Sequence, residues 1–404
     1  MWIQKNHTVL ISLMLFVGMF FPTSFNGVSS GTLTVISVIL CGMFYTYVLL
    51  RTGNLKVMGL ISVILSTIAL LFGTLISKLP NFSWTVALFF IVLCLLFCVD
   101  IKQIKVDKSI EKVFSVFNII NIFIGIGIIA QNKFVGDFIL NYYSAFFDDL
   151  VPWMLRDSKP ILTFATHSIA GFYLHIFFFL NIRTYAANKR LRFLAFAMFY
   201  IGFGFFLQSN TGYLFFFLSL VVLVYQLYKM KKKRFLMLIA MIVVGIFSLD
   251  WFQLRTKATS AIETFKVLQA SGQSGFSARY SSDGVLVEIF QYIANNPFRP
   301  IGMSYGGDLW LTDSGLLITW IRGSLILFLA VYAAFFFFLR QQMMDKRLSI
   351  YLFAVFMLFE FAYPNLTYFR SYYLLPFIII YLNYLKGGKV ENVEKIKRLR
   401  FSFK

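Results

Sequence analysis

The chain alternates long apolar runs with shorter polar segments over most of its 404 residues. Many of these runs approach the roughly 20 residues that a helix needs to cross the hydrocarbon core of a bilayer. Backbone groups inside lipid must be hydrogen-bonded internally, so continuous apolar runs predict helices, and the alternation typical of barrel strands is not seen. We therefore predict an all-α integral membrane protein with about twelve transmembrane helices. The predicted spans cover about residues 8–22, 33–50, 57–76, 85–99, 113–130, 161–180, 193–207, 213–228, 235–249, 314–339, 348–363 and 371–385.

Composition supports the same class of protein. The chain is 59% hydrophobic and only 13% charged, whereas soluble domains have about 25% charged residues. The net charge of +20 would be compatible with nucleic-acid binding, but the basic residues fall in short clusters between apolar spans. Such clusters are typical of a membrane orientation signal with attraction to anionic lipid. We expect membrane lipid as a partner and no nucleic acid.

The basic residues also predict the orientation of the chain. Of the 37 Lys and Arg residues, 26 fall in the loops on the N-terminal side of the membrane and 10 in the alternate loops. Because Lys and Arg accumulate in cytoplasmic loops, both termini are predicted to be cytoplasmic. Acids contribute little to orientation, yet ten of the 17 lie in the predicted outer loops, which favours work on a polar substrate outside.

The predicted organisation is a single transmembrane bundle over residues 1–385, with two large outer segments. Residues 131–160 carry Phe134, Phe138, Tyr142 and Phe146 at helical spacing, which predicts an amphipathic helix lying on the membrane surface. Residues 250–313, between the ninth and tenth spans, form a large external helical loop that we expect to cap the bundle. The tail, residues 386–404, is predicted to be a basic cytoplasmic surface helix.

The external loop contains two helix candidates. The first covers about residues 257–270 and the second about 283–295, each with apolar residues on one face. The sequence NPFRPIG at 296–302 is predicted to end the second helix, because proline and glycine interrupt regular structure. The loop also carries several of the acidic and basic groups that could perform chemistry.

Two arginines are candidates for binding an anion. Arg279, in GFSARYSSDG, follows a flexible Gly/Ser stretch, and a guanidinium can bind a phosphate through two hydrogen bonds. The alternative is a solvated arginine, or one paired with Asp283. Arg322 lies roughly ten residues into a span, where ionisable groups are costly and usually functional. Its alternatives are a side chain that extends to the interface, or a buried pair with Glu360.

Two further residues could act as a base. Asp313 heads the tenth span, where it fits both a helix N-cap and a general base at the membrane–water boundary. His167 lies in the outer third of its span, where a packed histidine is the commoner case. His175 follows eight residues later, a spacing that does not match the i, i+4 zinc pair, so no metal site and no cofactor are expected. Without a nucleotide-binding motif, a lipid-linked and already activated substrate fits best.

Four stretches carry a resemblance to a known family. The chain resembles the Wzy-type O-antigen and capsular polysaccharide polymerases, which share a superfamily with the O-antigen ligases. The similarity covers the whole topology: many spans, cytoplasmic termini and one large external loop before the last spans. The local stretches are TFATHSIAGFYL at 163–174, QSNTGYLFFFLSL at 208–220, SARY with IFQYIANNPFRPIGMSYGG within 277–307, and DSGLLITWIRGSL at 313–325.

The resemblance implies a metal-independent glycosyltransferase in the bacterial cytoplasmic (inner) membrane. Its donor would be a growing glycan on undecaprenyl diphosphate, and its acceptor the terminal sugar of a single lipid-linked repeat unit. A chain-length regulator and a flippase would be partners in polysaccharide or lipopolysaccharide biosynthesis. By this resemblance, arginines stabilise the pyrophosphate and one residue activates the acceptor hydroxyl. The arginines are Arg279, Arg322, Arg255 and Arg299; the candidate bases are Asp313, then His167, Asp283 and Glu288.

Two alternatives remain open on the sequence. An O-antigen ligase would share the fold and the donor. A lipid-linked oligosaccharide flippase or another transporter would also suit twelve spans. Transporters of that kind often show similarity between two halves, and no internal repeat is visible in this chain.

Overall fold

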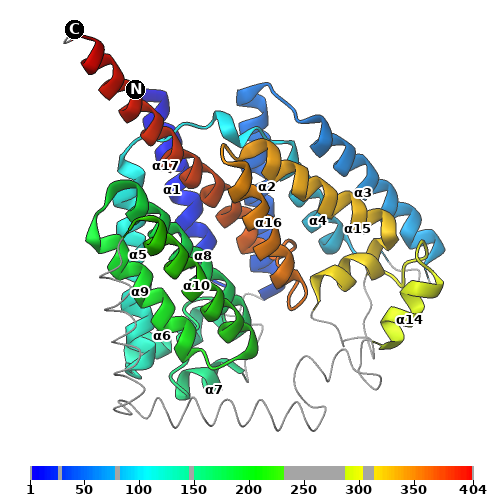
Figure 1. Cartoon of the computed structure of the whole chain (residues 1–404). Coiled ribbons are helices and arrows are strands. Elements are labelled where there is room, and N and C mark those ends of the chain that lie inside the picture. Colours follow the sequence, from blue (N-terminus) through cyan, green and yellow to red (C-terminus); the bar gives the residue numbers. More distant parts are fainter. Residues whose placement is uncertain are drawn as a thin grey trace. The chain divides into compact units, whose positions relative to one another are not determined.

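The computed structural model describes residues 2–25, 30–77, 82–144, 150–231, 287–303 and 314–402 (Figure 1). In these residues the chain forms fourteen α-helices and one short 3₁₀ helix, and no β-strand. The helices belong to two compact units. One comprises Met1–Ala170 and Asn295–Lys404, and the other Gly171–Ala294.

Most of the helices belong to the first unit. They are α1 (Trp2–Phe20), α2 (Ser30–Thr52), α3 (Val57–Ile76), α4 (Trp84–Cys98), η1 (Ile101–Gln103), α5 (Ser109–Ile129), α6 (Lys133–Tyr143), α7 (Leu150–Arg156), α15 (Gly315–Gln342), α16 (Lys346–Glu360) and α17 (Phe369–Ser402). The second unit holds nearly all of the remaining four, which are α8 (His167–Asn188), α9 (Leu191–Phe206), α10 (Asn210–Lys229) and α14 (Val287–Asn295).

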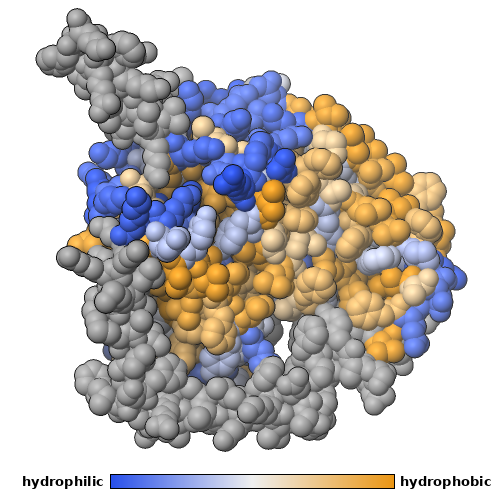
Figure 2. All heavy atoms as spheres, viewed as in Figure 1, coloured by the Kyte–Doolittle hydropathy of each residue, from blue (hydrophilic) through white to orange (hydrophobic). Residues whose placement is uncertain are grey.

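The helices agree with a multi-pass membrane protein. Five of them are long and apolar enough to cross a bilayer, and they cover Gly31–Arg51, Val57–Ile76, Ser109–Ile129, Asn210–Lys229 and Gly315–Gln342. Three shorter apolar helices accompany them. Apolar residues also cover the outward surface of α3 and α15 (Figure 2). Eleven predicted spans overlap an α-helix, whereas the ninth, 235–249, lies outside the described residues. The count of twelve membrane crossings stays a prediction.

Three predicted helical segments can be compared with the helices of the structure. The helix predicted at 161–180 begins only at His167, because residues 161–166 are buried in an irregular conformation. The outer segment 131–160 contains two helices, α6 and α7, and its residues 145–149, with Phe146, lie outside the described part. The second helix of the external loop ends at Asn295 as predicted, just before NPFRPIG. The first, 257–270, lies outside the described residues.

In the first unit, α3 packs against α15 and α4, and α1 packs against α17. The contact between α3 and α4 requires a residue without a side chain at position 59. A Cβ atom on Gly59 would lie 2.4 Å from the backbone nitrogen of Cys98 and from the carbonyl of Phe97. Glycine therefore lets the two backbones approach closely, as small residues do between membrane helices. A hydrogen bond from Ser62 Oγ to the carbonyl of Ala330, 3.0 Å long, joins α3 to α15.

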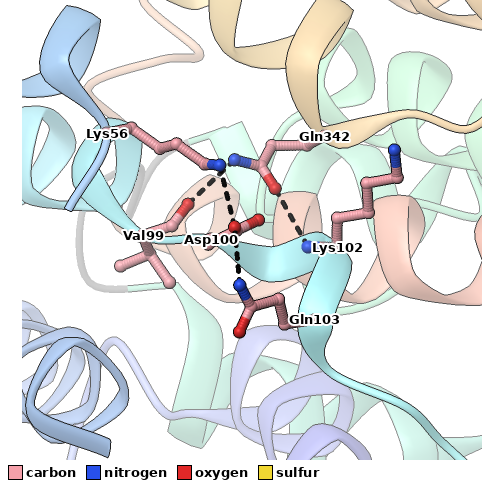
Figure 3. Close-up of polar contacts among 6 residues, drawn as sticks. All are labelled: Lys56, Val99, Asp100, Lys102, Gln103 and Gln342. Atoms are coloured by element: carbon pink, nitrogen blue, oxygen red, sulfur yellow. Dashed lines mark hydrogen bonds and ion pairs between the residues drawn. The ribbon is translucent and has the colours of Figure 1, made fainter. Parts of the chain in front are cut away.

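A polar network closes one end of this unit (Figure 3). Lys56 Nζ lies 2.8 Å from Asp100 Oδ2, which also accepts a hydrogen bond from the Gln103 amide. The buried Gln342 amide donates to the carbonyl of Val99 (3.0 Å) and accepts from the backbone N–H of Lys102 (2.9 Å). These contacts connect the beginning of α3, the turn after α4 and the end of α15. We call this the predicted inner end, because the distribution of Lys and Arg over the loops predicts that it faces the cytoplasm.

Candidate functional site

Only part of the predicted site lies in the described residues. Asp313, Arg279, Arg255 and Asp283 lie outside them, and Glu288 lies in α14. His167, Arg299 and Arg322 belong to the first unit and lie toward the end where α3 finishes at Ile76. We call this the predicted outer end, because it is opposite to the predicted inner end.

The first feature of the outer end is a break in α15. Gly323 (φ −142°, ψ 21°) and Ser324 (φ 63°, ψ −172°) leave the helical conformation. The chain therefore turns sharply between the first turns of α15 and the rest of the helix (Figure 1). The sequence ITWIRGSLILFL is apolar and continuous around this point, and it predicts an unbroken span.

The segment 297–302 fills the break. The carbonyl of Ile321 accepts hydrogen bonds from the backbone N–H of Ile301 (2.8 Å) and Gly302 (3.2 Å), and Leu325 N–H donates to the carbonyl of Pro297 (2.9 Å). The Trp320 indole N–H donates to the same carbonyl (3.1 Å). Because unpaired backbone groups are costly in lipid, a broken helix there needs such partners from neighbouring protein. The proline-rich segment predicted to end the external helix thus also completes α15.

Arg299 and Arg322 both lie beside the last turn of α3. Arg299 Nε donates to the carbonyl of Ile76 (3.0 Å), and a shallow surface hollow surrounds it, lined by Ile76 and residues 296–299. The carbonyl of Arg322 lies 3.6 Å from the position of a Cβ atom on Gly73. Arg322 is half-buried. The Arg322 backbone therefore lies level with the final turn of α3. Arg299 and Arg322, two of the four arginines predicted to stabilise the pyrophosphate, come from neighbouring segments.

Ser324 has a strained backbone. Its combination of positive φ and extended ψ belongs to a region that only glycine occupies readily, at a cost of about 1–3 kcal/mol for other residues. We expect Ser324→Gly to raise the free energy of unfolding by about 1 kcal/mol, and Ser324→Val to lower it. Equilibrium unfolding in detergent micelles measures both. A Ser324→Gly variant less stable than the wild type would show that the serine side chain, which accepts from Ile326 N–H (3.3 Å), outweighs the strain.

Glu360 connects the two halves of α15. The carboxylate is 1% exposed and accepts hydrogen bonds from Tyr332 Oη (2.8 Å) and the backbone N–H of Leu366 (2.5 Å). Tyr332 follows the break, and its hydroxyl lies 3.4 Å from that of Thr319, which precedes it. Gly315 makes room for the carboxylate, because a Cβ there would lie 2.0 Å from Glu360 Oε2. Glu360 thus holds α15 and the connection between α16 and α17 together.

The second feature of the outer end is a buried irregular segment, residues 159–166. All eight residues are buried, and Leu162 and Ala165 have positive φ angles of 53° and 63°. The carbonyl at the end of α1, Met19 O, accepts from Thr163 Oγ1 (2.6 Å). Irregular backbone at membrane depth is tolerated where it is buried in protein or lines a cavity, and strain of this kind often marks functional positions.

Arg370, at the start of α17, is fully buried against this segment. Its Nη1 donates to Met19 O (2.6 Å) and Thr163 Oγ1 (2.8 Å), and its Nη2 lies 3.5 Å from Phe21 O. No carboxylate contacts it among the residues that the structure describes. The negative end of the α1 dipole and the aromatic faces around the guanidinium stabilise the charge. Those rings belong to Tyr143, Phe164 and Phe369, with centroids 5.2–5.5 Å away.

Lys159 and His167 flank the same segment. Lys159 is 5% exposed, and its Nζ lies 3.6 Å from the centre of the Trp153 ring and 3.7 Å from Asp157. Burial lowers the pKa of Lys159, and Asp157 opposes this shift. His167 lies within electrostatic range of Lys159. Its Nδ1 atom is buried without a hydrogen-bond partner among the described residues. We call Lys159, His167 and Arg370 the outer basic group.

The sequence indicated only part of this site. It predicts His167 as a candidate base, whereas Lys159 and Arg370 contribute only to the ten basic residues of the predicted outer loops. The one available signal was the setting of Arg370 in LTYFRSYYLL, an aromatic and apolar context that is unusual for an exposed arginine. The bonding of Arg370 to α1 and Thr163 joins residues up to 351 positions apart, and no local pattern reveals such a contact.

Comparison with known proteins gives no match: no family model, no curated protein and no solved structure is similar to this chain. Within the described ranges, no group of three or more His, Cys, Asp or Glu residues could hold a metal ion. The described part of the outer end brings together buried basic groups and aromatic rings.

Proposed function

We propose that this protein is a Wzy-type polysaccharide polymerase of the bacterial cytoplasmic membrane, with both termini in the cytoplasm. It would join oligosaccharide repeat units carried on undecaprenyl diphosphate at the outer face of the membrane, for O-antigen or capsule synthesis. The apolar helices support a multi-pass membrane protein, the class to which an enzyme acting on lipid-linked glycans belongs. The local resemblance described above supports the choice of substrate.

The observation that carries the proposal is the outer basic group around residues 159–166. A diphosphate that leaves a sugar gains negative charge as the bond breaks, and buried positive groups stabilise that charge most effectively because water is excluded. Lys159 and Arg370 are both nearly inaccessible to solvent, and Arg370 donates its hydrogen bonds to protein oxygens, so in the proposal their charges act on the diphosphate across the surrounding protein and not through direct contact. The flanking histidine and the two arginines at the break in α15 add further positive or hydrogen-bonding groups at the same end.

The proposed step needs no cofactor. The acceptor hydroxyl oxygen attacks the anomeric carbon of the donor glycan, and the bond between that carbon and the diphosphate oxygen breaks. Undecaprenyl diphosphate leaves with the electron pair. A base takes the hydroxyl proton, and Asp313 or His167 has this role in the proposal. Arginines, with Arg279 first among those predicted, neutralise the leaving diphosphate.

A glycan-length gel of the native host tests the function. With this gene deleted, we expect the ladder to collapse to a single repeat unit attached to its final acceptor, and a plasmid copy to restore it. Long glycan that stays on the lipid carrier would instead indicate a ligase. A failure of any repeat to reach the outer face would indicate a flippase.

The same assay tests the proposed base. We expect Asp313→Asn or His167→Gln to reduce polymer formation by about 100-fold or more, since general-base catalysis contributes about 10²–10⁴-fold. Lys133→Gln is the matched control, because Lys133 is an exposed charge at the start of α6 on the same predicted side. Full-length ladders from both variants, at normal protein levels, would remove these two residues from the mechanism.

A further inference from the structure

Four basic side chains gather at the predicted inner end, away from the site described above. Lys102 follows α4 in η1, Arg340 lies in the last turn of α15, Lys346 begins α16 and Lys386 lies in α17. Lys346 interacts electrostatically with the other three. We call these four residues the inner basic cluster. It is assembled from segments up to 284 residues apart, so only the fold creates it.

Two of the lysines are anchored by carbonyl groups, one in the last turn of α15 and one just after the helix ends. Lys346 Nζ donates to the carbonyl of Arg340, and Lys386 Nζ donates to that of Met344 (2.7 Å). The negative end of a helix dipole favours cations at this position. Each ammonium group has three donors, so two on each lysine remain after these bonds. The carbonyls therefore orient the lysines and leave most of their donors available.

Nearby acids do not neutralise the inner basic cluster. Asp100 is engaged with Lys56 and Gln103, and the Lys102 side chain points away from it (Figure 3). Asp345 caps α16 by accepting from the backbone N–H of Arg347 (3.1 Å). Desolvation, and then the charges of Lys102, Arg340 and Lys386, lower the pKa of Lys346. The cluster therefore keeps an excess of positive charge, with four basic side chains against the neighbouring carboxylate of Asp345.

An apolar surface borders the cluster on the same helices. Phe337 on α15, Met344 after it and Ile350 on α16 are 43%, 39% and 51% exposed. The hydrophilic residues where α15 meets α16 lie directly next to this apolar region (Figure 2). A ligand that combines a phosphate with a hydrocarbon chain would match both parts, whereas a soluble phosphate would use only the charges.

We propose that the inner basic cluster binds the phosphate of an anionic phospholipid, whose acyl chains lie along the exposed apolar side chains of α15 and α16. Basic residues next to the cytoplasmic ends of helices attract such lipids. The cluster combines half-buried Arg340 and Lys386 with exposed Lys102 and Lys346, which distinguishes it from a scattered surface charge. This inference does not depend on the proposed polymerase function.

Lipid titration of the purified protein tests the inference. In dodecyl maltoside micelles, dioleoyl phosphatidylglycerol should raise the thermal unfolding midpoint more than the same amount of dioleoyl phosphatidylcholine. The double variant Arg340→Gln/Lys346→Gln should bind phosphatidylglycerol about 30-fold more weakly, because each basic residue near an anionic surface strengthens binding by about 5-fold. Lys102→Gln should weaken binding about 5-fold. The Lys102 side chain has no hydrogen bond within the described part of the chain, so this variant is the one least able to disturb folding.

A second double variant, Lys105→Gln/Lys108→Gln, is the matched control. It removes two exposed charges from the same connection between α4 and α5, outside the cluster, and should leave phosphatidylglycerol binding unchanged. Equal loss in both double variants, or no preference for phosphatidylglycerol in the wild type, would overturn the proposal. The same stabilisation by sodium phosphate alone would assign the cluster to a soluble phosphate instead.

Discussion

Replacing Arg370 with leucine is expected to lower the free energy of unfolding by about 3 kcal/mol. Leucine fills part of the volume but donates no hydrogen bond, so Thr163 Oγ1 and Phe21 O lose their donor inside the protein. Hydrogen bonds to charged groups contribute about 1.5–3 kcal/mol each, and a buried acceptor without a partner costs about 1–3 kcal/mol. The partly offsetting gain is the removal of a charge that was costly to bury.

The variant Arg370→Lys separates the effect of the positive charge on stability from that of the guanidinium's hydrogen-bond geometry. Lysine keeps the positive charge but presents a single ammonium group instead of the planar fork that reaches both α1 and Thr163. We expect it to be more stable than the leucine variant and less stable than the wild type. Equilibrium unfolding in detergent micelles provides the comparison.

Arg192→Leu is the control for Arg370→Leu. Arg192 also lies near an aromatic ring, 5.0 Å from that of Phe193, but its side chain is exposed. Its loss should change the stability by less than about 0.5 kcal/mol. Equal stability of the Arg370→Leu and Arg192→Leu proteins would contradict the role of Arg370 in fastening α17 to α1 and the buried segment.

Gly59→Ala is the second substitution for which we expect a large effect, a loss of about 3 kcal/mol or more. The added Cβ would overlap the backbone of α4 at Phe97 and Cys98, which cannot rotate away as a side chain could. Overpacking typically costs about 1–3 kcal/mol, and more where the surroundings cannot relax. Lys56 N–H donates to the carbonyl of Cys98 (3.0 Å), and the Lys56–Asp100 pair resists separation of the two helices.

Gly202→Ala is the matched control for Gly59→Ala. Both glycines lie inside apolar helices, but no atom beyond its own helix lies within 4 Å of a Cβ built on Gly202. Alanine is the better helix former by about 0.8–1 kcal/mol, so Gly202→Ala should be neutral or stabilising. Thermal unfolding monitored by tryptophan fluorescence compares the two proteins. A Gly59→Ala protein as stable as Gly202→Ala would be evidence against close backbone packing of α3 on α4.

The positions of the helices were largely predictable, because each apolar run satisfies its own backbone hydrogen bonds. The helix predicted at 57–76 is α3, with the same bounds, and the end of α14 follows from NPFRPIG. The predicted helix positions were wrong where a segment finds its hydrogen-bond partners in distant parts of the chain. Residues 161–166 were expected to begin a helix, yet they pack irregularly where Thr163 meets α1 and Arg370.

The candidate site was predictable to a smaller degree. His167 and Arg322 could be named because ionisable residues are rare in apolar sequence, and Arg299, in the external loop, could be named through the family resemblance. Their surroundings could not, since the partners are distant in the chain: Arg299 bonds to Ile76, and the break beside Arg322 is completed by residues 297–302. The predicted depth of Arg322 rests on counting residues along an unbroken helix, and the break at Gly323 and Ser324 means that this count does not apply.

The sequence by itself therefore determined that this is a helical membrane protein, and it determined where most helices lie, because hydrophobic length and internal backbone bonding are local properties of the chain. Tertiary structure alone decided which charges are buried, where α15 breaks and which basic residues meet at each end. Those features depend on hydrogen-bond partners supplied by residues tens to hundreds of positions away, and a polar group can leave water only where the fold brings such a partner to it.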